Sequence, residues 1–191
     1  MRWLGVTAAV LLVLGLAGCA SEEAAPTPTL PERNGATETA AETPDTVDVS
    51  ELSEDELLET AVATYESYLQ MGLDVLRNDA SITDLESLTA PSMRETTDWI
   101  DSQSQTHTWT VEGAYQVLDA ELTNHETIDN QARIQFIACQ DASSLNVVNE
   151  NGEQLRDEDQ PIAWPIVVIV NNDSGTFQVE SVDPLEGDLR C

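Results

Sequence analysis

The residues of this chain that could carry chemistry are one acid and a group of aromatic side chains. An aspartic acid in an apolar pocket has a raised pKa and can transfer protons, and a tyrosine hydroxyl can donate a hydrogen bond beside it. The candidate pocket residues are Tyr65, Trp99, Trp109, Tyr115 and Asp119. Buried tyrosines more often pack in the core with the hydroxyl at its rim. Asp119 also follows a point where the apolar alternation of the strand changes face, so the sequence does not determine which side of the sheet Asp119 faces. We therefore assign no catalytic residue.

No pattern of metal ligands or of a cofactor site stands out. His107 and His125 lie on either side of the first long predicted strand and lack ligand spacing to any cysteine, so we interpret them as surface residues. The run Arg156–Asp159 is acidic but lacks the spacing of an EF-hand loop. We find neither a P-loop nor a Ser-His-Asp order. The sequence therefore predicts no metal and no cofactor.

Cys19 ends a short apolar run near the start of the chain. The apolar stretch from Val6 to Leu16 is shorter than the roughly twenty residues that a membrane-spanning helix needs. Leu16-Ala17-Gly18-Cys19 resembles the lipobox of bacterial lipoproteins, in which the peptide is cut before the cysteine and the cysteine sulfur carries a diacylglycerol. The resemblance implies a lipoprotein signal peptide at 1–18 and a lipid attachment site at Cys19. An ordinary signal peptide with an incidental cysteine is the alternative.

Residues 19–50 follow as a lipidated cysteine and a tether. This segment is rich in Ala, Glu, Thr and Pro and has few large apolar side chains, so it cannot bury enough surface to offset its ordering entropy. We expect a disordered acidic tether. Two acyl chains anchor a protein stably, so a diacylglycerol on Cys19 would hold the exported chain at the outer face of the cytoplasmic membrane.

Two further cysteines, Cys139 and Cys191, allow one pairing. Export places them in an oxidising compartment, which favours a disulfide. Such a bond would attach the C-terminal residue to a predicted strand. Two free thiols are the alternative.

The chain is strongly acidic. It has 36 acidic and 7 basic residues, for a formal net charge of −29. The acidic excess extends over residues 51–191 as well as the segment before them. Phosphate contacts need Lys and Arg patches, so nucleic acid is excluded as a partner. Solubility at a crowded surface and adaptation to salt are both open interpretations of the charge.

Residues 51–191 are predicted to form one domain that begins with helices. Ser53 and Glu56 have the spacing of a capping box, which predicts a helix start at this point. Apolar residues, among them Leu58 and Val62, then recur at three- and four-residue steps up to Leu76, which indicates one apolar face of a helix of about 25 residues. We expect shorter helices after Ser81 and after Pro91.

From Thr106 onward the apolar period changes to two, which indicates strands. The apolar phase switches within 109–122, as a β-bulge in a bent strand would produce. Further strands are expected around 134–139, 147–148, 166–170 and 177–182. Helices followed by antiparallel strands predict an α+β fold, with one long helix on a bent sheet of four to five strands that forms a cone.

This order of elements resembles the nuclear transport factor 2-like (cystatin-like cone) fold. More narrowly, residues 51–191 resemble a group of actinobacterial envelope lipoproteins. The shared features are Trp109-x-Val111-x-Gly113, the run Cys139-Gln140-Asp141-Ala142-Ser143, Val147-Val148, Gly152 and a terminal cysteine. The resemblance implies a fold and an envelope location, and it transfers no catalytic residue. Some members of the cone fold are isomerases or cyclases that use an Asp base and Tyr donors in a pocket between helix and sheet.

Two functions of different classes follow from these observations. The first is a membrane-anchored binding module for a small apolar ligand or an envelope protein. The alternative is a small enzyme of the isomerase or cyclase type. A cavity lined by an ionisable side chain would favour the enzyme, and a filled core would favour protein docking. We expect binding rather than catalysis.

Overall fold

A computed structural model describes residues 48–155, 161–185 and 191. The expected signal peptide, Cys19 and most of the expected tether lie outside the described residues, as does the acidic run at 156–159. Residues 44–191 make up one compact unit. No helix in the described part of the chain has both the length and the apolar character needed to cross a membrane.

The first half of the unit is helical. Its elements are the short 3-10 helix η1 (Val49–Glu51), α1 (Glu54–Leu76), α2 (Ile82–Ser87), η2 (Pro91–Met93) and α3 (Arg94–Thr106). The predicted capping box is confirmed, because the Ser53 hydroxyl accepts from the Glu56 amide and the Glu56 carboxylate accepts from the Ser53 amide. A second box at Ser81 and Asp84 starts α2.

The folded unit begins earlier than residue 51, where the sequence placed the boundary. Val49 is 1% exposed and belongs to the core. Its backbone amide donates to Oδ1 of Asn130, 2.8 Å away, in the turn between two later strands. The sequence assigned this valine to the tether because one apolar residue among acids gives no periodic signal. Residues 48–50 are therefore part of the fold.

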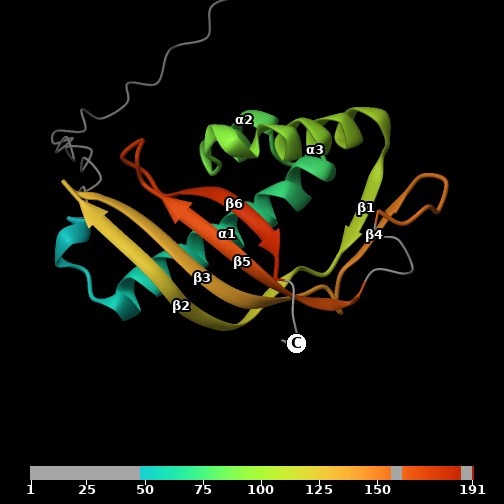
Figure 1. Cartoon of the computed structure of the whole chain (residues 1–191). Coiled ribbons are helices and arrows are strands. Elements are labelled where there is room, and N and C mark those ends of the chain that lie inside the picture. The colour runs from blue at the N-terminus through green and yellow to red at the C-terminus, as the bar shows by residue number, and fades with distance from the viewer. Residues whose placement is uncertain (1–47, 156–160, 186–190) are drawn as a thin grey trace, which may run out of the picture. The chain divides into compact units, whose positions relative to one another are not determined.

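The second half consists of strands. They are β1 (Trp109–Glu112), β2 (Gln116–Ile128), β3 (Gln131–Asp141), β4 (Asn146–Asn149), β5 (Ala163–Asn171) and β6 (Gln178–Pro184). β2, β3, β5 and β6 form a four-stranded antiparallel sheet in that order, and β1 pairs with β4 in a separate two-stranded ribbon. The predicted α+β class with a bent antiparallel sheet is confirmed (Figure 1).

The strand predicted across 109–122 is in fact two strands in two sheets. Gly113 separates them with φ +77°, and a Cβ at this position would overlap the carbonyl oxygen of Ser144. The chain turns there and leaves the ribbon for the main sheet. The predicted bulge is confirmed, since the β2–β3 register shifts between Leu118 and Glu121, with Asp119 at φ 51°.

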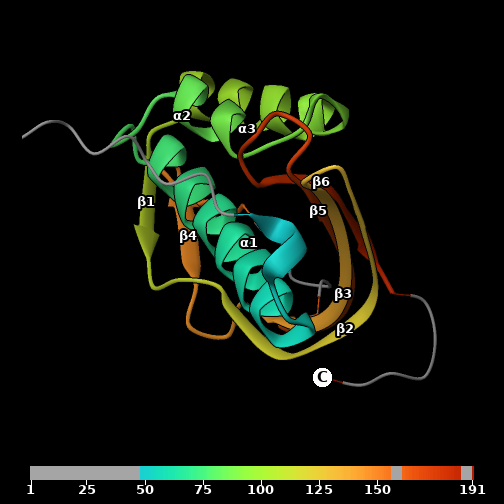
Figure 2. The ribbon, with the colours of Figure 1, turned by 90° about the vertical axis from the view of Figure 1, so that its left-hand side faces the viewer.

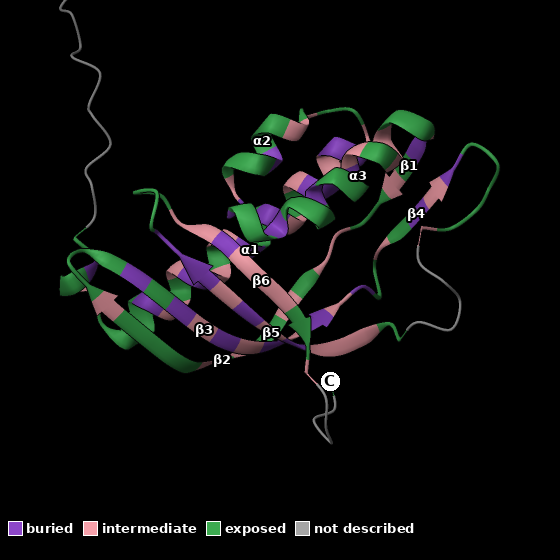
Figure 3. Ribbon diagram, turned by 45° about the horizontal axis from the view of Figure 1, so that its top comes forward, coloured by how far each residue is buried: buried purple, intermediate pink, exposed green. Residues whose placement is uncertain are grey.

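α1 lies inside the curve of the four-stranded sheet, with α2 and α3 across one side and the β1–β4 ribbon across another (Figure 2). The concave face of the sheet supplies alternate buried residues of β3, including Ile134 and Phe136. The buried face of α1 includes Leu57, Ala61, Tyr65, Tyr68 and Gly72. The outer sides of α2 and α3 are largely exposed (Figure 3).

Cys139 and Cys191 form a disulfide with their Cα atoms 5.5 Å apart. The predicted pairing is confirmed, and it attaches the last residue of the chain to β3.

Candidate ligand-binding cavity

A cavity of about 330 Å³ lies between α1, α3 and the concave face of the sheet. Ligand sites in proteins commonly have volumes of about 300 to 1,000 Å³ and predominantly apolar walls. The aromatic part of this wall consists of Tyr65, Tyr68, Trp99, Tyr115 and Trp164. Aliphatic and thioether side chains complete most of it, so the cavity is suited to an apolar molecule.

α1 provides one wall because its sequence places the right side chains on one face. Tyr65, Tyr68 and Gly72 follow steps of three and four residues, which bring side chains to the same side of a helix. Gly72 leaves room near α3. A Cβ added at this position would lie 3.6 Å from Cδ1 of Ile100, which is ordinary contact distance. A small residue here thus contributes to the open space between the two helices.

The sheet provides the opposite wall. Gln140 on β3 and Trp164 on β5 are register partners, so their side chains lie side by side on one face. Gln140 is buried, and its Oε1 accepts a hydrogen bond from the Tyr65 hydroxyl of α1. This contact joins the helix wall to the sheet wall at the cavity.

The tyrosines on α1 remain protonated at any physiological pH. Burial, with a smaller effect from the nearby Tyr115, raises the pKa of Tyr68 to about 12. Burial also raises the pKa of Tyr65, with smaller effects from Tyr68 and Tyr115. The rings of Tyr65 and Tyr68 lie 6.0 Å apart and nearly parallel. The cavity therefore contains neutral hydroxyl groups rather than phenolates.

Three of the five residues proposed from the sequence line this cavity, namely Tyr65, Trp99 and Tyr115. Trp99 is 49% exposed, which places it at the rim, with the exposed Thr96 near it. Trp109 lies elsewhere: it is buried, its indole N–H donates to the Gln103 carbonyl 3.1 Å away, and its ring meets His107 edge to face.

Asp119 also lies away from the cavity. It occupies the bulge of β2 and is exposed, because the left-handed backbone at φ 51° turns it out of the strand alternation. No other carboxyl group, and no histidine, appears among the described residues that line the cavity.

Both histidines lie outside the cavity wall. His125 is exposed on β2. Nδ1 of His107 lies 3.4 Å from the carboxylate of Glu150, which also accepts from the Thr108 amide. Among the described residues, no three His, Cys, Asp or Glu side chains are grouped so that they could hold a metal ion.

Sequence reasoning missed Tyr68, Gln140 and Trp164. The predicted apolar face of α1 ran through Leu58 and Val62, both only half-buried, and this choice placed Tyr68 off the face. Gln140 was missed because a polar residue at the end of a strand is predicted to be exposed to solvent. The alternation of β3 was the available clue, because Gln140 continues the series of buried even-numbered positions.

No protein-family model matches the chain, and no curated protein is similar to it in sequence. Among solved structures, the chain is similar to the intermembrane space region of the chloroplast protein ARC6, with a TM-score of 0.47 and 12% identity. The match covers 68% of this chain and 97% of that one. A likeness at this level carries no argument about function.

Proposed function

We propose that this protein is a lipid-anchored envelope protein whose folded domain binds a small, apolar ligand in the cavity between α1, α3 and the sheet. The observation that carries the proposal is the volume of about 330 Å³ with a mainly aromatic and aliphatic wall. A core without such a space would have favoured a protein partner on the outer face of the sheet. The described wall contains no carboxyl group, which favours binding over an isomerase- or cyclase-like reaction.

The membrane part of the proposal rests on the lipobox-like sequence ending at Cys19. A Cys19→Ser chain should move from the membrane fraction to the medium. Retention of that chain on membranes after a carbonate wash would contradict a lipid anchor.

Ligand binding is tested on purified protein by native mass spectrometry. The Cys19→Ser chain is used because it needs no detergent, and detergent would compete for an apolar cavity. We expect a co-purified small molecule, or saturable uptake of 2-isopropylnaphthalene as a neutral apolar probe.

The matched variants are Gly72→Leu and Gly72→Ala. The leucine side chain extends into the cavity and should abolish uptake. The alanine adds one methyl group at ordinary contact distance from Ile100 and should stabilise the helix by roughly 0.5–1 kcal/mol, with uptake retained. Equal uptake by both variants would show that the probe binds elsewhere.

A further inference from the structure

The cavity wall contains two hydrogen-bonding groups that the protein itself leaves unused. Gln140 and Tyr68 are 6% and 7% exposed, so both side chains are more than nine-tenths buried. Both line the cavity. Burying a polar group without a partner is costly, so two such groups in one wall require an explanation.

The first group is the Nε2 amide of Gln140. Its Oε1 already accepts from the Tyr65 hydroxyl, which leaves the two N–H donors of the amide. No described residue accepts a hydrogen bond from them. Among the described residues no fully enclosed polar side-chain atom lacks a partner. The Gln140 amide nitrogen is therefore in contact with the open space of the cavity.

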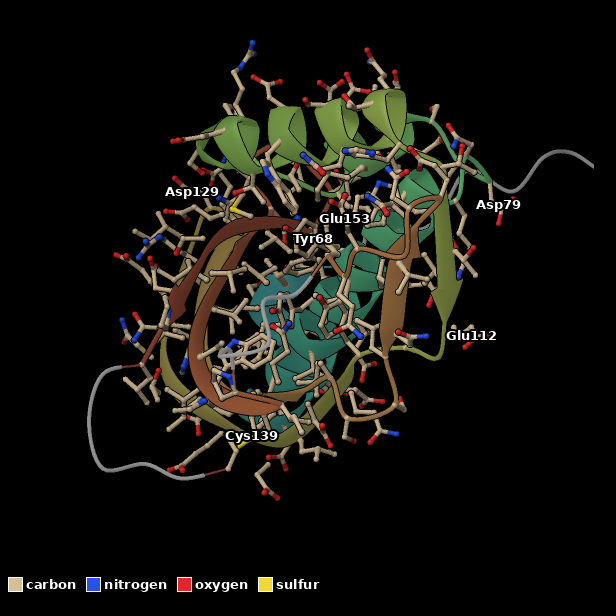
Figure 4. The ribbon with its side chains drawn as sticks, turned by 90° about the vertical axis from the view of Figure 1, so that its right-hand side faces the viewer. Tyr68, Asp79, Glu112, Asp129, Cys139 and Glu153 are labelled. Carbon is tan, nitrogen blue, oxygen red and sulfur yellow. A yellow bond between two sulfur atoms is a disulfide. The ribbon has the colours of Figure 1, made fainter. Side chains whose placement is uncertain are left out.

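The second group is the Tyr68 hydroxyl. It forms no hydrogen bond with any described residue, and the same reasoning places its oxygen at the cavity. Figure 4 shows Tyr68 beneath α3 and beside α1. The centre of its ring lies 6.0 Å from the centre of the Tyr65 ring. The hydroxyl of Tyr65 in turn donates its hydrogen bond to Gln140. Tyr65 thus contacts both of the residues that carry the unused groups.

Charge restricts what these groups can bind. None of the described cavity residues carries a full charge, so none of them would give a charged ligand an ionic partner in place of its lost hydration. The formal net charge of −29 also repels anions from the molecule. A neutral ligand with a polar atom that accepts hydrogen bonds avoids both penalties.

We propose that the cavity selects a neutral ligand with an apolar body and one hydrogen-bond acceptor, such as a ketone or ester carbonyl, which accepts from the Gln140 amide and the Tyr68 hydroxyl. This inference rests on the proposed function and adds the chemical class of the ligand. The aromatic and aliphatic wall contacts the apolar body, and the two donors fix its orientation.

The test compares three naphthalene probes of similar size by equilibrium dialysis against the Cys19→Ser chain. They are 2-acetylnaphthalene, its hydrocarbon analogue 2-isopropylnaphthalene, and the anion 2-naphthoate. We expect the ketone to bind about fivefold to tenfold more tightly than the hydrocarbon, as one net hydrogen bond would give. The anion should bind most weakly.

Two variants assign the preference to the proposed donors. Tyr68→Phe removes one hydroxyl and keeps the ring. The double variant Tyr65→Phe/Gln140→Met removes the amide together with its protein partner, so that neither is left unpaired. Each should reduce the preference for the ketone and leave hydrocarbon binding unchanged, whereas Asp119→Asn, outside the cavity, should change neither.

The outcomes separate the two proposals. If the hydrocarbon binds but the ketone has no advantage, or if both variants keep that advantage, the ligand class is wrong and the binding function stands. If none of the three probes binds, the proposed function itself fails and the ligand class fails with it.

Discussion

The hydroxyl of Tyr65 on α1 donates a hydrogen bond to the side-chain oxygen of Gln140 on β3, inside the folded unit. Tyr65 is 1% exposed, so removing the hydroxyl would leave the Gln140 oxygen without this donor in a buried place. Tyr65→Phe should therefore lower the free energy of unfolding by about 1–2 kcal/mol. Urea denaturation followed by circular dichroism measures the change.

Tyr68→Phe is the matched control for this prediction. The Tyr68 hydroxyl has no hydrogen-bond partner among the described residues. Its loss should therefore lower the free energy of unfolding by less than half of the decrease expected for Tyr65→Phe. An equal cost for the two substitutions would contradict the role assigned to the contact between Tyr65 and Gln140.

Gly113 allows the chain to pass from the β1–β4 ribbon to the main sheet. A Cβ at this position would overlap the backbone carbonyl of Ser144, and the residue has φ +77°. Gly113→Ala should destabilise the unit by more than about 2 kcal/mol, since both backbone strain and a clash with main chain oppose it.

Gly175→Ala separates these two causes. Gly175 also has a positive φ, +86°, but no atom lies within 4 Å of an added Cβ. It should cost only the strain, about 1 kcal/mol. Thermal melts of both variants compare their melting temperatures. If Gly113→Ala is as stable as Gly175→Ala or more stable, the result contradicts the close approach to Ser144.

The disulfide between Cys139 and Cys191 closes a loop with a sequence separation of 52. On the chain-entropy model such a bond contributes up to about 4 kcal/mol. Cys191→Ser, and reduction of the native chain, should both lower the melting temperature. A non-reducing peptide map of protein alkylated before lysis checks the pairing, and recovery of both cysteines in alkylated form would contradict it.

An ion pair links β3 to β6 on the side of the sheet away from α1. Nε of Arg133 donates to Oε2 of Glu180 and Nη2 donates to Oε1, and both donor–acceptor distances are 2.9 Å. Nδ2 of Asn171 donates a third hydrogen bond, to Oε2 of Glu180. The hydrogen bond from Arg133 lowers the pKa of Glu180 below its ordinary value of 4.5. Because Arg133 is half exposed, Glu180→Gln should cost less than about 1 kcal/mol at pH 7.

The pH dependence of this cost follows from the direction of the shift. A lowered pKa in the folded state gives stability that is complete above the unfolded pKa and is lost as the pH falls through the folded value. The difference between wild type and Glu180→Gln in urea melts should thus shrink below about pH 4.5. Glu66→Gln on the exposed face of α1 is the control. A difference that persists unchanged at pH 2 would show that the charge of Glu180 is not its source.

Local signals predicted much of this fold because they depend on nearby residues. The capping box at Ser53, the helix after Pro91 and the bulge near Asp119 each follow from a few neighbouring side chains. The disulfide followed from counting cysteines. These features require no knowledge of distant contacts.

Features that depend on distant contacts were missed. The break between β1 and β2 at Gly113 depends on the close approach of Ser144, thirty-one residues later. The alternation of apolar residues by itself predicts a single strand across this segment. Gln140 is buried because Tyr65, seventy-five residues earlier, satisfies its oxygen. The space beside Gly72 depends on how α1 packs against α3, and helical periodicity does not show that a glycine on the apolar face leaves a space open.

The most direct test of the account is to locate a bound apolar molecule. Intermolecular nuclear Overhauser effects are measured between 2-isopropylnaphthalene and the methyl groups of the methyl-labelled Cys19→Ser chain. We expect effects to Met93, Ile100 and Ile166, which line the cavity, and none to Ile137, which alternates to the opposite face of β3. Effects confined to Ile137 and its neighbours, or no effects at saturating probe, would contradict the binding function.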